Sequence, residues 1–255
     1  MDETDHLRLA GVTRLSLRGR GPKDAFIFDP HRLAFPCWAL GLADTRPGLL
    51  VTLDRHLDLV PPSDVTAIPD AQDPLRQLDE FARWSLDVRN YDHVLAAMEA
   101  GIIKDAIVIA RAKPRGALER TEYVDRRGEK HRILAVPTID RLADGFAGVG
   151  QSPEAREAET LIREARSIVL DVDLDCFTTT SDADPTEVVP WPRELIRRML
   201  VPPESGPFWD AVLFKTKVLT IAREPLHCGG VIASHRLFDD LAGVLFVELL
   251  RTDLP

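Results

Sequence analysis

Short apolar runs recur along the chain, and polar or turn-forming residues follow most of them directly. These runs predict strands at 25–28, 49–53, 106–110, 133–136, 167–170, 211–214 and 218–222. The run at 49–53 follows Pro47-Gly48 and is almost wholly apolar, which is typical of a strand buried on both faces of a sheet.

Apolar residues at helical spacing occupy the stretches between these runs. They predict helices at 33–43, through 78–86, at 94–100, from Ser152-Pro153 to about Arg166, near 192–200 and at 235–250. Ser152 and Pro153 have the residue types of a helix cap and first turn, and Asn90 is predicted to cap the helix at 94–100. Trp38 and Trp84 are expected in the core, and the charged segment 111–132 is expected to be a solvated hairpin or insertion.

Strands that alternate with helices favour an α/β fold. The pattern predicts one domain over 1–255, with a mostly parallel central sheet and helices on both faces. In such sheets ligands bind beyond the carboxyl ends of the strands. The polar residues that directly follow the predicted strands are therefore the candidates for a functional site.

The first polar cluster is Asp54-Arg55-His56-Leu57-Asp58, which directly follows the strand at 49–53. Side chains of an extended chain repeat with period two, so Asp54, His56 and Asp58 would point the same way. Two carboxylates and an imidazole that converge are costly unless something holds them, and a divalent cation accepts both kinds of ligand. The alternative is a solvated loop after a strand.

The second cluster is Asp171-Val172-Asp173-Leu174-Asp175, in which the carboxylates again alternate with apolar residues. Like charges at a strand end repel one another, so their survival as anions implies a cation or a shifted pKa. His31, just beyond the strand at 25–28, adds an imidazole. The combined set suffices for two metal ions, and oxygen-rich ligands with histidine and no cysteine favour Mn²⁺ over Fe²⁺, Co²⁺ or Zn²⁺.

The two aspartate motifs resemble those of the ureohydrolases, the superfamily of arginase and agmatinase. Asp54-Arg55-His56-Leu57-Asp58 is similar to their Asp-x-His-x-Asp motif, and Leu170-Asp171-Val172-Asp173 to their Asp-x-Asp motif. The Asp-Val-Asp-Leu-Asp-Cys-Phe sequence at 171–177 is closer to an atypical branch that includes peptide arginases. Here Asp29-Pro30 precedes His31 where the family has Gly-Gly-Asp, and Leu174-Asp175-Cys176-Phe177 replaces its Gly-Leu-Asp-Pro continuation.

The resemblance implies an arginase-like three-layer fold and two Mn²⁺ ions per chain. The expected metal ligands are His31, Asp54, His56, Asp58, Asp171, Asp173 and Asp175, with Asp171 and Asp173 favoured over Asp175 in the second motif. Asp58 and His93 are expected to move protons, while Glu224 and Asn90 are expected to bind the substrate. The reaction would be hydrolysis of an arginine guanidinium to ornithine and urea.

The residues after Asp58 bear on the size of the substrate. They are Leu59-Val60-Pro61-Pro62-Ser63, in place of the Asn and Ser with which arginases contact the α-carboxylate of free arginine. This difference favours arginine within a peptide. The alternatives are a small-molecule ureohydrolase, a metal-dependent phosphoesterase with Arg55 and Arg223 as basic groups, and a non-catalytic binding protein of the same fold.

Composition narrows the class of partner. The net charge is −9, which disfavours nucleic acid and suits a cationic substrate. The 3 cysteines share no close spacing, which favours a reducing compartment; Cys176 and Cys228 are expected to be small buried residues near the site. No signal peptide or membrane span is apparent, so a cytoplasmic protein without membrane contact, compatible with a homo-oligomer, is expected.

Overall fold

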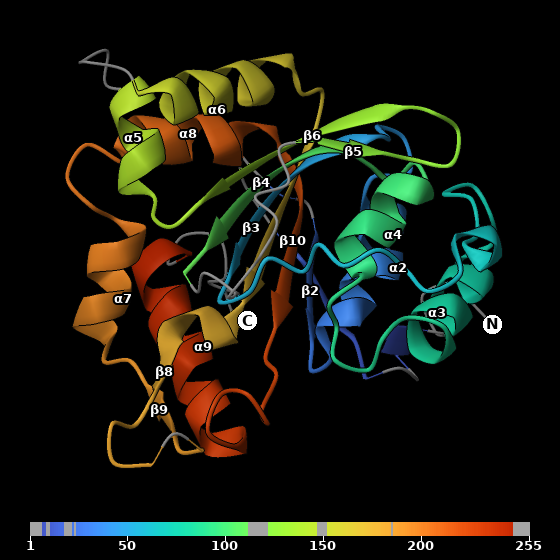
Figure 1. The fold of residues 1–255 in the computed structure, drawn as a ribbon. Coiled ribbons are helices and arrows are strands. Elements are labelled where there is room, and N and C mark those ends of the chain that lie inside the picture. The colour runs from blue at the N-terminus through green and yellow to red at the C-terminus, as the bar shows by residue number, and fades with distance from the viewer. Residues whose placement is uncertain are drawn as a thin grey trace.

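The fold is built on one large, mostly parallel sheet (Figure 1). The computed structural model describes residues 7–8, 11–17, 22, 24–111, 122–146, 152–184 and 186–246. Within these ranges an 8-stranded sheet has the order β1-β2-β10-β7-β3-β4-β6-β5. In that order the strands span Thr13–Ser16, Asp24–Phe28, Thr216–Ala222, Ile168–Asp173, Gly48–Asp54, Ile103–Ala110, Lys130–Val136 and Glu122–Val124.

Only the two edges of the sheet are antiparallel. β1 pairs antiparallel with β2, and β5 pairs antiparallel with β6, whereas all the pairs between β2 and β6 are parallel. Every residue of β3 and of β7 is buried, because helices cover both faces of the sheet at its centre. The carboxyl ends of the parallel strands therefore lie along one edge of a buried core.

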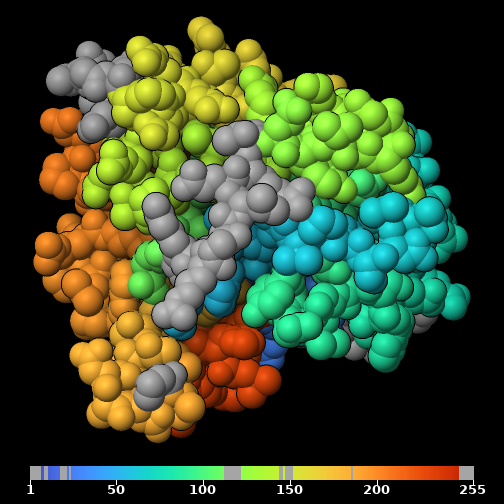
Figure 2. Space-filling model, viewed as in Figure 1, coloured from blue at the N-terminus to red at the C-terminus, as the bar shows by residue number. Residues whose placement is uncertain are grey.

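Two groups of helices cover the two faces. The first group is α2 (Ala34–Gly41), α3 (Leu75–Trp84) and α4 (His93–Glu99), which share one buried apolar cluster. The second is α5 (Asp140–Phe146), α6 (Pro153–Glu164), α7 (Arg193–Leu200), α8 (Gly206–Lys215) and α9 (Val231–Leu245). Figure 1 shows the groups on opposite sides of the sheet, and the cyan-green and orange surfaces in Figure 2 lie correspondingly far apart.

Short elements complete the described chain. They are the 3₁₀ turns η1 (His31–Leu33), η2 (Val65–Ala67) and η3 (Leu174–Phe177), and the small ribbon of β8 (Thr178–Thr180) and β9 (Val188–Pro190). η1 follows β2 and η3 follows β7, so each turn begins where a strand of the large sheet ends. None of the described helices combines the length and apolar character needed to cross a membrane.

The predicted α/β class with helices on both faces is confirmed. Ser152 caps α6 as expected, since its hydroxyl accepts a hydrogen bond from the amide of Ala155 at 3.1 Å. Trp38 is fully buried, as expected. The segment 111–132 contains strand β5 and the hairpin turn into β6, and its residues 112–121 lie outside the described ranges. The single-domain organisation stays a prediction.

Three local predictions are wrong. Residues 211–214 belong to helix α8 and not to a strand, because one face of this apolar run packs on the sheet while Phe214 is 78% exposed. Trp84 ends α3 and is 81% exposed, since α3 turns its other side to the core. The predicted helix at 235–250 is α9, which begins earlier, at Val231; residues 247–250 lie outside the described ranges.

A further wrong prediction concerns Asn90 as the cap of helix α4. The helix begins at His93 and its cap position is Asp92. Asn90 has a left-handed backbone, with φ of 63°, and its side chain points away from the helix to the end of β10. The turn before α4 thus presents the amide of Asn90 to the neighbouring strand ends.

Candidate metal centre

The ends of four neighbouring strands bring the predicted site residues together. β2, β10, β7 and β3 are parallel and adjacent in that order. His31 lies just past β2, Glu224 just past β10, Asp173 at the end of β7 and Asp54 at the end of β3. Residues distant in sequence are therefore placed side by side by the register of the sheet.

His31 lies at the centre of this cluster. Its Nδ1 atom is 3.1 Å from a carboxylate oxygen of Asp173 and 3.4 Å from oxygens of both Asp54 and Asp58. The ring is 1% exposed, and Nδ1 finds no hydrogen-bond partner in the described part of the chain. Three carboxylates thus converge on one buried, unsatisfied imidazole nitrogen.

His56 forms a second, more open group. Its Nδ1 atom lies 3.2 Å from an oxygen of Asp175 and 3.6 Å from one of Asp54, and its side chain is 38% exposed. The expected period-two alignment of Asp54, His56 and Asp58 is not how they meet, because β3 ends at Asp54 and the chain then turns. The amide of His56 donates to Asp54 at 2.7 Å, and Asp58 takes a left-handed backbone with φ of 49°.

Asp175 reaches the cluster through a similar turn. It lies in η3 and not in strand β7, and its amide donates to the carboxylate of Asp173 at 3.0 Å. The amide of Arg55 donates to Asp175 at 3.3 Å. The turns after β3 and β7 therefore contact each other through Asp175, one of the acidic residues predicted from sequence.

Glu224 and Asn90 form one side of the cluster. Oε1 of Glu224 accepts a hydrogen bond from the amide of His31 at 3.1 Å and another from Nδ2 of Asn90. Glu224 has a φ of 35°, so Asp58, Asn90 and Glu224 all hold the left-handed backbone that is uncommon outside glycine. Strained residues of this kind gather at functional sites in folded proteins.

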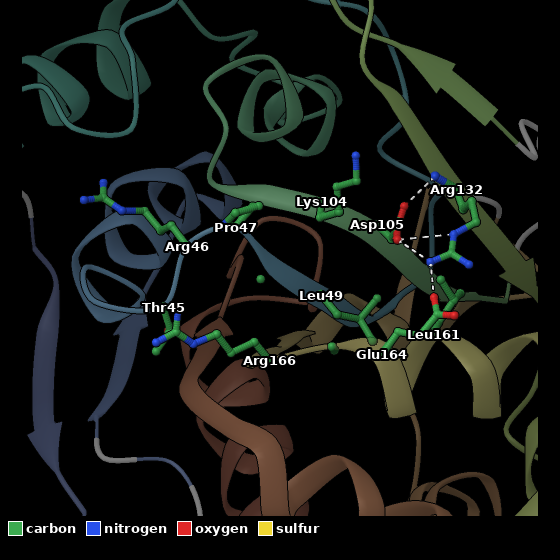
Figure 3. A pocket seen from close by; sticks show the side chains of 12 residues that line it. Thr45, Arg46, Pro47, Leu49, Lys104, Asp105, Arg132, Leu161, Glu164 and Arg166 are labelled. Carbon is green, nitrogen blue, oxygen red and sulfur yellow. Dashed lines mark hydrogen bonds and ion pairs between the residues drawn. The ribbon is translucent and has the colours of Figure 1, made fainter.

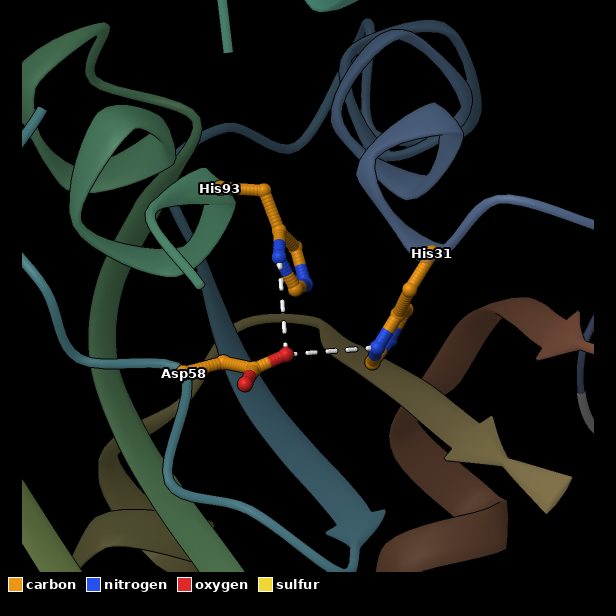
Figure 4. Close-up of side chains that lie close together, drawn as sticks. All are labelled: His31, Asp58 and His93. Carbon is orange, nitrogen blue, oxygen red and sulfur yellow. Dashed lines mark ion pairs between the residues drawn. The ribbon is translucent and has the colours of Figure 1, made fainter. Parts of the chain in front are cut away.

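His93 packs beside His31, and Asp58 lies near both rings (Figure 4). Oδ2 of Asp58 lies between the two rings, 3.4 Å from Nδ1 of His31 and 3.8 Å from Nδ1 of His93. Nδ1 of His93 also hydrogen-bonds the carbonyl of Asn90 at 2.8 Å. Burial, with the positive charge of His31, lowers the pKa of His93 to about 3. The neutral ring can donate its Nδ1–H group to the carbonyl of Asn90 and thereby hold that residue, while proton transfer by His93 stays a prediction.

Asp171 is placed differently from the other acidic residues. It is wholly buried, and its carboxylate accepts hydrogen bonds from Thr52, Thr220 and Nε2 of His31. Among the described residues, the groups with ligand atoms within 4.8 Å of one another include Asp54, Asp58, Asp173 and Asp175 but not Asp171. The geometry therefore favours Asp173 and Asp175 over the expected pair Asp171 and Asp173.

The imidazoles of the cluster hold protons strongly when no cation is bound. Burial lowers the pKa of His31, but the charges of Asp171 and Asp173 outweigh burial and raise it well above its ordinary value. Hydrogen bonds to Asp175 and Asp54 raise the pKa of His56 to about 11. Both rings therefore supply positive charge that the carboxylates need.

The carboxylates show the same shortage of positive charge. Burial, followed by the charge of Asp54, raises the pKa of Asp58 well above its ordinary range. Burial and the charges of Asp175 and Glu224 do the same for Asp173. Asp54 and Asp171 are exceptions: hydrogen bonds with His31 and His56 outweigh burial and lower the pKa of Asp54, and the charge of His31 with its hydrogen bond outweighs burial and lowers the pKa of Asp171.

These observations fit a metal-binding site. The donor set is carboxylate oxygen and imidazole nitrogen without thiolate, which suits Mn²⁺. Cys176 and Cys228 are buried beside the site, as expected, and burial raises the pKa of both thiols, which keeps them protonated. The unsatisfied Nδ1 of His31 is the observation that a cation at the point of convergence would explain.

Several supporting residues were not predicted. Arg111 donates to the carbonyl of Cys176 at 2.7 Å and thereby fixes η3, which carries Asp175. Thr52 precedes Asp54 by two positions on β3, so period two alone places the two side chains on one face. Thr220 gave no such signal, because it lies in an apolar strand and its partner is distant in sequence.

A separate cavity of about 330 Å³ lies at the opposite, amino-terminal ends of β3, β4 and β6 (Figure 3). It is lined by Arg46, Gly48, Lys104, Asp105, Arg132 and Arg166, among others. Arg132 donates to Asp105 at 2.8 Å and also to Glu164 at 2.8 Å. None of the predicted site residues lines this cavity.

Comparison with known proteins finds a weak likeness to solved structures and no match of another kind. No protein-family model matches the chain, and no curated protein matches it. Among solved structures, arginase from Bacillus cereus has 17% identity and a TM-score of 0.40 over 88% of this chain and 71% of its own. Arginase from Bacillus subtilis has 18% identity and a TM-score of 0.40, over 90% and 72% respectively. Arginase from Bacillus caldovelox has 16% identity and a TM-score of 0.39, over 90% and 69%. Such values do not establish a common family, so the function rests on the residues themselves.

Proposed function

We propose that this protein is a binuclear manganese hydrolase that cleaves the guanidinium group of arginine residues in a peptide. The observation that carries the proposal is the convergence of three carboxylates on the buried, unsatisfied Nδ1 of His31, with Glu224 and Asn90 alongside. The products would be an ornithine residue and urea.

Two adjacent groups of residues would hold the metal ions. One group is His31, Asp54, Asp58 and Asp173, and the other is Asp54, His56, Asp173 and Asp175. Asp54 belongs to both the buried and the more open cluster, which makes it the residue expected to contact both ions. When bound, two divalent cations would supply the positive charge that lowers the pKa of water and neutralises developing negative charge.

Glu224 is the proposed anchor of the substrate. Its carboxylate lies within 4.8 Å of ligand atoms of Asp173 and Asp175. Burial and the charge of Asp175 raise the pKa of Glu224, and a cationic guanidinium would offset this repulsion between carboxylates. A charge-assisted, two-point contact to a guanidinium also fixes its plane. The side-chain amide of Asn90 holds Glu224 in place through Oε1.

The proton balance involves Asp58. Water adds its oxygen to the guanidinium carbon Cζ, the bond from Cζ to Nε of arginine breaks, and both protons of the water end on the departing amine, which leaves as an ammonium group beside neutral urea. Burial and the charge of Asp54 raise the pKa of Asp58, which suits a carboxyl group that accepts and then returns a proton. Its Oδ2 lies beside His31 at the centre of the cluster.

The residues after Asp58 support a peptide over free arginine. Leu59 is buried and Val60 is 50% exposed, and the prolines that follow lack a backbone donor. The side chains of residues 59–62 cannot hydrogen-bond an α-carboxylate, whereas discriminating sites contact such groups directly. The arginines near the site lend less support to a phosphate substrate, since Arg223 pairs with Asp29 and the guanidinium of Arg55 donates to Thr178.

Mass spectrometry tests this function directly. Purified protein with Mn²⁺ should lower the mass of a blocked arginyl peptide by about 42 Da per arginine, the difference between a urea unit lost and a water gained. Elemental analysis should find two Mn²⁺ ions per chain. If free arginine or agmatine is turned over faster than the blocked arginyl peptide, the substrate is a small molecule and not a peptide. Stable metal binding without any urea release would indicate a non-catalytic binding protein.

The metal ligands are tested by Asp54→Ala. This variant should lose at least one Mn²⁺ and all activity, because Asp54 is proposed to contact both ions. A fully active Asp54→Ala protein would contradict the binuclear arrangement. Hydrolysis of a phosphate ester by the wild-type protein, with no urea released from any guanidinium compound, would favour a phosphoesterase.

A further inference from the structure

We infer that Asp171 is a positioning residue that selects the metal-binding tautomer of His31. The inference rests on the proposed metal centre and assigns Asp171 a role other than ligand. Its carboxylate accepts a hydrogen bond from the Nε2–H group of His31, so that in the metal-loaded protein the lone pair of Nδ1 faces the point on which Asp54, Asp58 and Asp173 converge.

Both oxygens of Asp171 are already engaged within the sheet. Oδ2 accepts from Nε2 of His31 at 2.8 Å and from the hydroxyl of Thr52 at 2.7 Å, while Oδ1 accepts from the hydroxyl of Thr220 at 2.5 Å. Asp171 on β7 pairs in register with Thr52 on β3 and with Thr220 on β10. The carboxylate is therefore fixed from both sides by neighbouring strands.

The direction of the hydrogen bond at Oδ1 of Asp171 is determined by Trp38. The indole Nε1 of Trp38 can only donate, and it donates to Oγ1 of Thr220 at 2.9 Å. The hydroxyl proton of Thr220 is thus left to donate to Asp171. Oδ2 in turn accepts from the hydroxyl of Thr52, so both oxygens of Asp171 act as acceptors, which is the ionised form of the carboxyl group.

An ionised Asp171 leaves only one role for Nε2 of His31, that of donor. In a neutral imidazole the other nitrogen then carries a lone pair, and here that nitrogen is the buried and unsatisfied Nδ1. A proton on Nδ1 would occupy the point on which the three carboxylates converge. Carboxylates commonly orient metal-binding histidines in this way, and their loss weakens metal binding about 10- to 100-fold.

The test is Asp171→Asn, a change of one atom. Thr220 donates toward the Oδ1 position, so the amide oxygen should take that place and the amide NH₂ should face Nε2 of His31. Nε2 must then accept, which moves the imidazole proton to Nδ1. We expect Mn²⁺ affinity at one of the two positions to fall about 10- to 100-fold, measured by electron paramagnetic resonance of free Mn²⁺.

The matched control is Asp105→Asn. Asp105 is also a buried aspartate of the central sheet, but it pairs with Arg132 beside the cavity at the opposite strand ends (Figure 3). This variant should bind Mn²⁺ as the wild-type chain does. Unchanged affinity at both positions in a folded Asp171→Asn protein would overturn the inference.

A second measurement needs no variant. Histidine labelled with ¹⁵N in the wild-type chain, loaded with diamagnetic Zn²⁺, should show the proton of His31 on Nε2 and none on Nδ1. A proton on Nδ1 in the loaded protein would overturn the role of Asp171 and leave the metal centre intact. A wild-type chain that binds no divalent metal would overturn the proposed function, and this inference with it.

Discussion

Burial and charge oppose each other at the residues of the candidate centre. Desolvation alone would make His31 neutral and would protonate the carboxylates around it. The observed balance instead raises the pKa of His31 and His56 and lowers that of Asp54. In the metal-free protein, protonated imidazoles therefore supply the positive charge that bound cations would otherwise provide.

This balance predicts how the stability of the metal-free protein depends on pH. The pKa of His56 is about 11 in the folded chain and 6.5 in its ordinary state, so the folded state binds the proton more tightly. The stabilisation is complete below about pH 6.5 and is lost as the pH rises toward 11. With a chelator present, the urea concentration at the midpoint of unfolding should decrease as the pH is raised from 6 to 9.

The control for this prediction is His56→Gln, which removes one of the shifted groups. Its urea midpoint should fall less steeply over the same pH range, because glutamine does not titrate. A wild-type midpoint that stays constant or rises from pH 6 to pH 9 would contradict the raised pKa of His56.

Glu224 allows a prediction that separates substrate binding from metal binding. Glu224→Gln keeps the shape of the side chain but removes the charge that would face the guanidinium. Loss of one partner of a buried charged contact costs about 2–5 kcal/mol, so kcat/KM should fall on the order of 100-fold or more. Both Mn²⁺ ions should remain bound, as elemental analysis can show.

The control is Glu99→Gln, a buried glutamate that accepts hydrogen bonds from Tyr123 and Arg126, outside the site. Its kcat/KM should match that of the wild-type chain. An active Glu224→Gln protein would instead indicate that another acidic residue binds the substrate.

At the scale of elements, sequence pattern predicted most strands and the edge at which the site lies. The buried strands at 25–28, 49–53 and 218–222 were recognisable because parallel strands covered on both faces form apolar runs. The run at 211–214 has the same length and composition but is helical, which periodicity over four residues cannot distinguish.

The site was only partly predictable for a related reason. Spacing indicated the acidic residues at the ends of β3 and β7, but the partners of Asp171 come from other strands and depend on register. Asn90 looked like a helix cap from its neighbours, whereas its contact with Glu224 depends on the fold as a whole. Long-range hydrogen bonds of this kind leave little mark on local sequence.

The close packing of α2 on β10 gives a prediction at this scale. A Cβ atom added at Gly41 would lie 2.0 Å from Cγ2 of Val218, so either the helix or the strand must move. Gly41→Ala should lower the free energy of unfolding by about 1–3 kcal/mol, measured by urea denaturation. The double variant with Val218→Ala should lose less than the sum of the two single changes.

Gly206→Ala is the matched control, because a Cβ atom at Gly206 meets nothing within 4 Å. Its free energy of unfolding should change little, and the reduced freedom of the unfolded chain favours a small gain. Strict additivity of Gly41→Ala and Val218→Ala would contradict the contact between α2 and β10.

At the scale of the whole molecule, the acidic centre links stability to metal. The four adjacent strands β2, β10, β7 and β3 bring acidic residues together at their carboxyl ends. These residues are buried, so little water can screen their charges. Removing a bound cation would leave carboxylates that must repel one another or take up protons. The centre should therefore weaken the fold when empty and strengthen it when loaded.

We accordingly expect chelation to lower the melting temperature and Mn²⁺ to restore it. A ligand at 100 times its dissociation constant stabilises the folded state by about 2.7 kcal/mol, which calorimetry detects easily. The melting temperature of Asp54→Ala should respond much less to added Mn²⁺. An identical melting curve after verified metal removal would show that the acidic residues do not form one buried site.

The position of β10 has a consequence for synthesis of the protein on the ribosome. β10 (Thr216–Ala222) lies between β2 and β7, so β2, made near the start, has no parallel neighbour until residue 222 has left the exit tunnel. Glu224 emerges later still. A nascent chain paused before β10 would expose unpaired edges of both β2 and β7, which are prone to aggregate. The metal centre would thus be complete only once β10 has paired with both strands, and chaperones could bind the exposed edges of β2 and β7 until then.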